Sequence, residues 1–141
     1  MTVRASILND IDGTLKAVTG VTDASVFVGN IVDFDLDNLP TGVDLPLVFA
    51  IQGPEQKASE PVMGMETWNW TITVEVWCIS SAVETLYGLI QAAMLADITC
   101  GGYARKTERT GGDVLSIDPG RGLSAFQLTY QIQYRHPWGT P

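Results

Sequence analysis

Two long segments of the chain alternate between apolar and polar residues, and this period of two predicts amphipathic β-strands. The segment 67–80 has an apolar side chain at every second position, with Asn, Thr and Glu between. The segment 126–135 repeats the pattern with Gln and Thr between, and Pro137 ends it. We expect one face of each strand to lie in the core. The predicted core positions are Trp68, Trp70, Ile72, Val74, Val76, Cys78, Phe126, Leu128, Tyr130, Ile132 and Tyr134.

Two other segments space their apolar residues as a helix does. Residues 3–18 carry one apolar stripe, with Thr2 suited to cap its start and Gly20 to stop it. A second stripe predicts a helix from residue 83 to about 95, because it follows the first long strand and keeps the helical period. Ser81 and Glu84 have the spacing of a capping box before it. The stripes consist of Val3, Ile7, Ile11, Leu15 and Val18 in the first helix and Val83, Leu86, Tyr87, Ile90 and Met94 in the second.

The remaining segments predict shorter elements. Residues 24–32 favour a strand by their β-branched content, and 33–44 are typical of a polar loop. Residues 45–51 are apolar on both faces, which indicates a strand buried on both sides, with Pro46 at its start. Residues 52–66 contain two Pro, two Gly and many charges, so we expect a long, mobile loop there.

The order of these elements predicts the fold class. Residues 103–109 and 113–117 favour two short strands around Thr110-Gly111-Gly112. The chain then runs helix, three strands, helix, short strands and a last strand. This order predicts one α+β domain over residues 1–141, with a mostly antiparallel or mixed β-sheet packed against two α-helices. A length of 141 residues, of which 45% are hydrophobic and 17% charged, suits a single globular domain.

Charge and cysteine content exclude several classes of function. A net charge of −8 argues against binding nucleic acid through its phosphates, which needs clustered Lys and Arg. Cys78 and Cys100 form no C-x-x-C pair, and one His leaves too few soft ligands for zinc. We expect two buried free thiols, although one disulfide is the alternative. Neither a signal peptide nor a membrane span is expected, so we predict assembly in a reducing cytoplasm and no membrane partner.

One short motif suggests an enzyme. Asp10-Ile11-Asp12-Gly13-Thr14-Leu15 resembles the D-x-D-G-T-L signature of haloacid-dehalogenase-like phosphatases, in which the first Asp is the nucleophile and the second an acid/base. Asp113 and Asp118 resemble the acidic metal-binding motif of the same family. That chemistry needs the first Asp at the carboxyl end of a buried parallel strand, whereas this segment has a helical period. We therefore favour a polar helix face for Asp10 and Asp12 and a turn for Asp113 and Asp118.

Other candidate sites are weaker still. Asp33, Asp35, Asp37 and Asp44 have the spacing of a calcium loop, but Asn38 replaces the required Gly and no helices flank the segment. A solvated acidic loop is the better interpretation. His136 has no nearby Ser or Cys and follows a strand, so we expect a surface or interface His. Asn69-Trp70-Thr71 matches a glycosylation sequon by chance, in the absence of a secretory signal. We predict no catalytic, cofactor-binding or metal-binding residues.

Basic residues are few and gather in the second half of the chain. Arg105, Lys106 and Arg109 lie within five positions, and Arg121 follows them. A solvated hairpin explains this grouping, and an electrostatic contact with an acidic partner subunit explains it equally well. We name Arg105, Lys106, Arg109 and Arg121 as candidate interface residues.

Two stretches, and the order of elements, resemble the tail-terminator proteins of lambda-like long-tailed bacteriophages. The first is "ETWNWTITVEVWCIS" followed at once by the helix "SAVETLYGLIQAAM". The second is "GGYARKTE", a variable loop and "SAFQLTYQIQYRHP" near the carboxyl end. An amino-terminal helix and the strand "LPLVFAI" extend the resemblance over nearly the whole chain. The family has no catalytic residues to assign.

The resemblance implies a structural virion protein, assembled in the bacterial host cytoplasm. Such subunits form a homo-oligomeric ring, expected to be a hexamer, on the head-proximal end of the tail tube. The ring stops tube polymerisation and offers a surface to the head-completion protein at the connector. Its other partners are the tail tube protein and the DNA that passes through the lumen without specific binding. Segments 52–66 and 107–123 are then expected to be flexible docking loops. Another head–tail joining or tail-tube protein of related fold is the runner-up.

Overall fold

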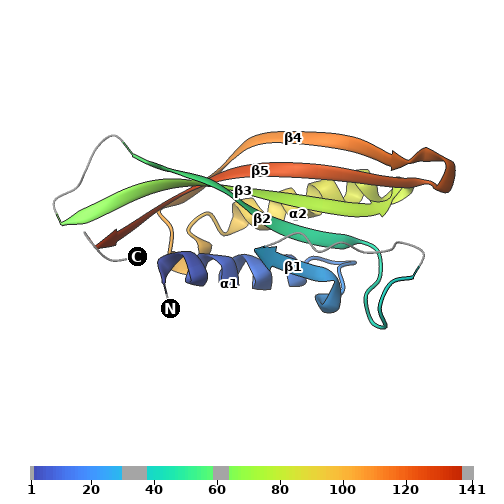
Figure 1. The fold of residues 1–141 in the computed structure, drawn as a ribbon, viewed down its shortest axis with the longest axis horizontal. Helices are drawn as coiled ribbons and strands as arrows, with labels where there is room; N and C mark the ends of the chain where they lie inside the picture. Colours follow the sequence, from blue (N-terminus) through green and yellow to red (C-terminus); the bar gives the residue numbers. More distant parts are fainter. Residues whose placement is uncertain (1, 30–37, 59–63, 138–141) are drawn as a thin grey trace.

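The computed structural model describes residues 2–29, 38–58 and 64–137. Five strands of this part form one sheet in the order β1-β2-β3-β5-β4, with β1 and β2 parallel and all other neighbours antiparallel (Figure 1). The predicted α+β fold with a mixed sheet and two helices is confirmed. In chain order the elements are α1 (Val3–Lys16), β1 (Val26–Gly29), β2 (Leu47–Lys57), β3 (Met65–Ile79), α2 (Val83–Ala96), β4 (Lys106–Asp118) and β5 (Leu123–Pro137).

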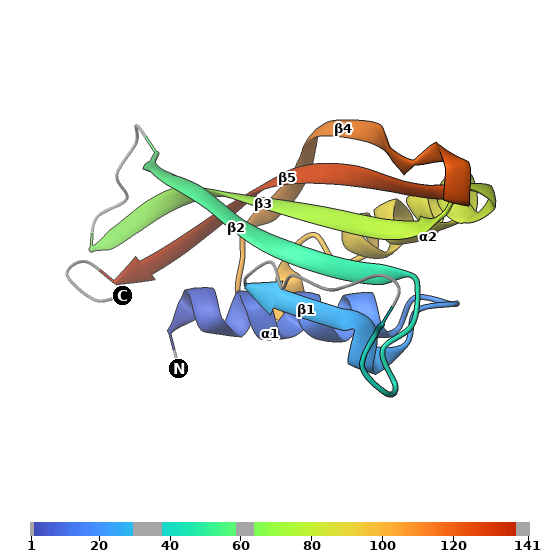
Figure 2. The same cartoon turned by 45° about the vertical axis from the view of Figure 1, so that its right-hand side comes forward.

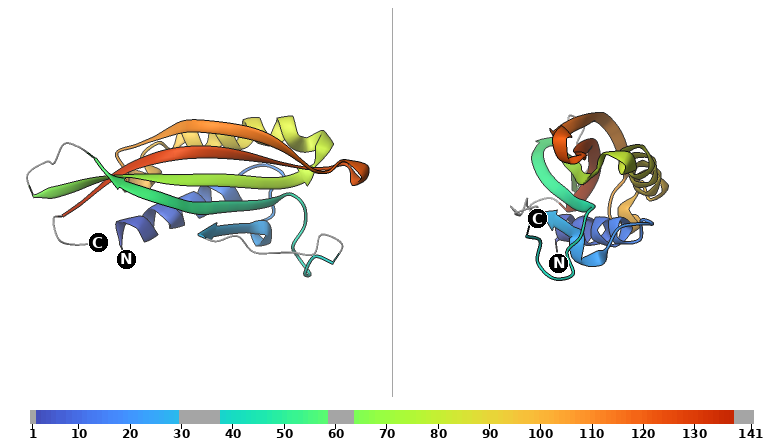
Figure 3. Two further views of the ribbon diagram at one scale, coloured as in Figure 1. Left: turned by 45° about the horizontal axis from the view of Figure 1, so that its top comes forward. Right: turned by 90° about the vertical axis from the view of Figure 1, so that its right-hand side faces the viewer.

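Both helices pack on the same face of the sheet, which Figure 3 shows end-on. One hydrophobic cluster joins the apolar stripes of α1 and α2 to the buried face of β3 and β5, as their sequence periods predicted. Trp70, Ile72 and Val74 are completely buried on that face. The other face of the central strands is half-exposed and consists mainly of amides and hydroxyls. Its residues include Asn69, Thr71, Thr73, Gln127, Thr129, Gln131 and Gln133.

The start of α1 agrees with prediction and its end differs slightly. Thr2 is the N-cap, and its Oγ1 accepts a hydrogen bond from the Ala5 N–H at 3.1 Å. The helix ends at Lys16 with Ala17 as its C-cap, so Val18 and Gly20 lie beyond it. Val18 is still buried in the core. The last residue of the apolar stripe, Val18, therefore lies beyond the end of the helix.

The segment 45–51 is a buried strand, as predicted. Leu45–Pro46 is a cis peptide, and β2 begins directly after it at Leu47. Leu47 and Phe49 are buried on one face, and Val48 and Ala50 on the other. The predicted strand 24–32 is observed as β1, preceded by a 3₁₀ turn over Asp23–Ser25, and residues 30–32 lie outside the described part. The predicted polar loop 33–44 is described only from residue 38.

The prediction of a mobile loop at 52–66 is wrong for both ends of that segment. β2 continues through Lys57 and β3 begins at Met65, so residues 52–57 and 65–66 extend the sheet, and residues 59–63 lie outside the described part. The ladder shifts register between Gln52 and Glu55, which places Gly53 and Pro54 in a bulge. A Cβ on Gly53 would lie 2.9 Å from the Thr71 carbonyl oxygen, so this close approach needs glycine. Two of the residues that suggested a loop, Gly53 and Pro54, are thus part of a β-bulge.

Two further expectations are corrected. Residues 106–118 form one strand, β4, and Thr110 sits at a register shift instead of dividing two short strands. The flexible loop expected at 107–123 is therefore reduced to a 3₁₀ turn over Pro119–Arg121. No capping box forms either, because a 3₁₀ turn over Ser80–Ala82 leads out of β3 and makes Ala82 the N-cap of α2 without a side-chain hydrogen bond.

Candidate interaction surfaces

The D-x-D-G-T-L motif lies inside α1 and not at the end of a strand. Asp12 forms an ion pair with Lys16, with 3.0 Å between Oδ2 and Nζ, one helical turn away. Asp113 and Asp118 lie on β4, at the opposite edge of the sheet from the strand beside α1 (Figure 1). The described residues include no group of three or more His, Cys, Asp or Glu side chains placed to hold a metal ion. The motif therefore lacks the position at a strand end that the phosphatase chemistry needs.

Asp10 instead pairs with Asp97, the residue that follows α2. Gly101 N–H donates to Asp97 Oδ1 at 3.0 Å, and a Cβ on Gly101 would lie 2.8 Å from Asp10 Oδ1. Burial and the Asp97 carboxylate raise the pKa of Asp10 to about 6. The hydrogen bonds from Asp10 and from the Gly101 N–H lower the pKa of Asp97. The pair thus shares a proton below pH 6 and repels above it.

Asp10→Asn is expected to stabilise the protein at neutral pH and not in acid. Because the folded-state pKa of Asp10 is raised, its stabilising contribution is complete below pH 4 and is lost as the pH rises through 6. An amide keeps the hydrogen bond without titrating. After allowance for solvent screening, we expect a gain of about 1 kcal/mol at pH 7.5. Urea unfolding at pH 4 and 7.5 measures it, and an equal effect at both values would contradict the assignment; Asp12→Asn is the control.

Other residues singled out in the sequence either lie outside the described part or hold the fold together. Asp33, Asp35 and Asp37 lie outside the described residues, as does the side chain of His136. Asp44 is held by Ser25, whose Oγ donates to its carbonyl oxygen at 2.8 Å and accepts from its N–H at 2.9 Å. Asn69, of the sequon, accepts a hydrogen bond from Gln133 Nε2 at 3.1 Å within the sheet.

The two cysteines are free and buried, as predicted. Burial raises the pKa of the Cys78 thiol, and it raises the pKa of the Cys100 thiol to about 11. Cys100 Sγ lies 3.6 Å from Thr107 Oγ1. Because a thiol with a raised pKa is a poor nucleophile and metal ligand, neither cysteine fits a reactive role.

The four candidate interface cations lie on or beside β4, the edge strand of the sheet. Arg105 Nη1 donates to Gln133 Oε1 at 3.2 Å, and Lys106 Nζ lies 3.0 Å from Glu108 Oε1. Arg109 Nη1 donates to Gln91 Oε1 at 2.5 Å, and its guanidinium lies 5.4 Å from the ring centre of Tyr87. Arg121 lies in the turn after β4, 3.9 Å from Asp118 Oδ2. The structure thus places all four near one edge.

That edge is the most prominent uncovered surface that the structure describes. β4 is 13 residues long and pairs only with β5, so within the described residues its outer backbone groups face no strand. Val114 and Leu115 are 53% and 39% exposed, although they point to opposite faces of the strand. Sequence periodicity could not identify this surface, because an edge is defined only by the order of strands in the folded sheet. Exposed apolar residues on an unpaired edge favour pairing with another chain.

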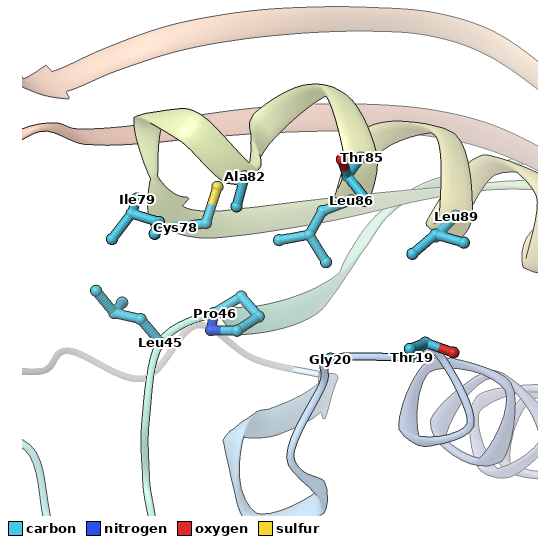
Figure 4. Close-up of a pocket in the computed structure, with 10 residues that line it drawn as sticks. All are labelled: Thr19, Gly20, Leu45, Pro46, Cys78, Ile79, Ala82, Thr85, Leu86 and Leu89. Carbon is cyan, nitrogen blue, oxygen red and sulfur yellow. The ribbon is translucent and has the colours of Figure 1, made fainter.

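An apolar groove forms a second exposed surface, at the start of α2 (Figure 4). It has a volume of about 440 Å³ and lies between the Leu45–Pro46 and Thr19–Gly20 segments on one side and α2 on the other. Ile79, at the end of β3, is 52% exposed beside it. Its lining is almost entirely apolar, which does not suit a charged substrate.

Tyr130 lies on β5, opposite Arg109 of β4. Its hydroxyl is buried and has no hydrogen-bond partner among the described residues. Burial raises its pKa to about 12. Tyr130→Phe is therefore expected to raise the free energy of unfolding by about 1 kcal/mol, since it removes an unpaired polar group. Tyr134→Phe is the matched control, because that hydroxyl donates to Glu55, and its loss should destabilise. Urea unfolding compares the two; destabilisation by both would show that the Tyr130 hydroxyl has a partner.

Comparisons with known proteins give the fold. No protein-family model matches the sequence, and no curated protein matches it. Among the described residues, no helix is long and apolar enough to cross a membrane. A solved structure with a similar fold is a chain from the virion of a native gene transfer agent particle, with a TM-score of 0.50 and 11% identity. The match covers 96% of this chain and 98% of that chain, so the two share one fold from end to end.

Proposed function

We propose that this chain is a structural virion protein that caps the head-proximal end of a phage tail tube as a ring. In this role it stops tube polymerisation and provides the surface for head–tail joining. The single observation that carries the proposal is the long, uncovered and partly apolar edge of β4. The fold shared with a virion chain supports it, because the likeness spans both chains. We propose no enzymatic activity.

A closed ring needs two different surfaces on each subunit, one of which meets the other on the next copy. The edge of β4 and the opposite edge at β1 are two such surfaces on one sheet. We propose that Arg105, Lys106, Arg109 and Arg121 contact a neighbouring subunit, since they lie on or beside the strand of one of these edges in a chain of net charge −8. The proposed partners are further copies of this chain, the tail tube protein and a head-completion protein.

The charge of the chain agrees with a ring through which DNA passes without specific binding. The net charge of −8 disfavours phosphate contacts, and the open face of the sheet offers mostly neutral amides and hydroxyls. The proposed site of action is the tail of the virion, after assembly in the bacterial cytoplasm. A head–tail joining or tail-tube protein of related fold is the second candidate, because the same edge would serve a tube subunit.

A tube-growth assay tests the proposal and separates the two candidates. Purified tail tube protein is polymerised with increasing amounts of this chain, and tube lengths are measured by electron microscopy. A terminator shortens the tubes and is found only at their ends. A tube subunit is incorporated along their length instead. Unchanged tubes with no bound chain would exclude both roles.

A further inference from the structure

Residues on the two edge strands, β1 and β4, lie on common rows that run across the sheet. The register of the ladders runs from Val26 through Val48, Val76 and Phe126 to Val114, so the first and last of these lie on one transverse row. Val26 and Val114 are therefore at the same level on opposite edges. Both are on the helix-covered face, because directly opposed residues share a face.

The strand directions at the two edges are also compatible. β1 is parallel to β2, and three antiparallel steps lead from β2 to β4, so β1 and β4 run in opposite directions. Rotation about an axis roughly along the strands preserves their directions. A neighbouring copy in a ring would thus present its β1 antiparallel to β4, the arrangement in which edge strands hydrogen-bond directly.

β4 is bent level with Gly29, the last described residue of β1. Gly29 shares a row with Ile51, Thr73, Thr129 and Gly111, and the register shift of β4 is at Thr110, next to that row. A bulge bends its strand, and β4 is visibly bent along its length in Figure 2. The bend therefore falls level with the end of the described part of β1.

We infer that the ring closes by antiparallel pairing of the β4 edge of one copy with the β1 edge of the next. This inference rests on the proposed function and identifies its self-contact. Exposed Val114 would pack beside Val26 and Val28, which are the apolar residues of β1 on the same face. On that face Arg109 and Thr107 are level with Gln52 and Glu55 of β2.

Disulfide trapping tests the pairing. Val114→Cys is combined with Val28→Cys in one chain, and with Val26→Cys in a second, since a register shift of two residues exchanges these partners. Cross-strand Cβ atoms are close enough for a disulfide. Cys78 and Cys100 are each 2% exposed, so they add little background in the folded protein. The variants complement a gene deletion under reducing conditions, and the purified particles are then oxidised.

The expected result is a ladder of covalent oligomers up to the closed ring with one of the double variants, and none with any single variant. Normal particles without a ladder from either double variant would overturn the edge pairing and leave the proposed function standing. A covalent dimer from Val114→Cys alone would also overturn it, in favour of two β4 strands paired with each other. Failure of the proposed function is distinguishable from failure of the edge pairing. If the proposed function is wrong, deletion of the gene itself leaves the tails unchanged.

Discussion

Trp70→Ala is expected to lower the free energy of unfolding by about 3–5 kcal/mol, the usual cost of removing a large aromatic side chain from a core. Trp70 is fully buried on β3, and its ring lies edge-on to Tyr134 with 6.2 Å between ring centres. The Arg4 guanidinium lies 4.5 Å from the ring centre and joins α1 to this part of the sheet. Because small domains have only about 5–15 kcal/mol of stability, this loss is a large fraction of the total.

Trp70→Phe is the matched control for that substitution. The Trp70 Nε1 is buried without a hydrogen-bond partner among the described residues, so phenylalanine removes an unpaired donor while keeping most of the ring. We expect a loss of less than about 2 kcal/mol. Urea unfolding followed by far-ultraviolet circular dichroism compares the two variants. Equal losses would show that the site tolerates no change of shape, contrary to this account.

Val114→Lys with Leu115→Lys is expected to abolish ring assembly while leaving the fold intact. Both side chains are substantially exposed in the single chain, so each substitution should change stability by less than about 0.5 kcal/mol. Once β4 pairs with a neighbouring copy, the ammonium groups of the two introduced lysines would lose water on opposite faces of the joined sheets. Charged residues are the usual means by which proteins prevent edge strands from pairing.

Complementation of a gene deletion by this double variant measures the effect, with tail length and head attachment scored by electron microscopy. Leu95→Lys with Ile98→Lys is the control, since these residues are 38% and 46% exposed near the end of α2 and are not on an edge strand. We expect the control to restore normal particles and the β4 variant to fail. Normal particles from both would show that β4 takes no part in assembly.

The long strands and both helices were predictable because their periods of burial are regular. β3 alternates in burial from Trp70 to Val74 and β5 from Phe126 to Tyr134, and α1 keeps its stripe through Leu15. The errors fell where β-bulges use loop-forming residues. Gly53 and Pro54 in β2, like the residues around Thr110 in β4, suggest turns by composition yet stay within ladders.

The candidate surface was only partly accessible to sequence reasoning. The basic residues were identified by their grouping, but their common location on an edge strand depends on β5 lying between β3 and β4. Val114 and Leu115 appeared to be ordinary strand residues, because a sequence does not show which strand remains unpaired. The helical period placed Asp10 and Asp12 on a helix correctly, whereas Asp113 and Asp118 were expected in a turn and lie on β4.

Electron microscopy of lysates from a parent phage that lacks this gene tests the central claim most directly. A tail terminator predicts tails of irregular and excessive length without heads, and re-supply of the wild-type gene should restore uniform tails joined to heads. Tails of normal length joined to heads in the deletion lysate would contradict the proposed function.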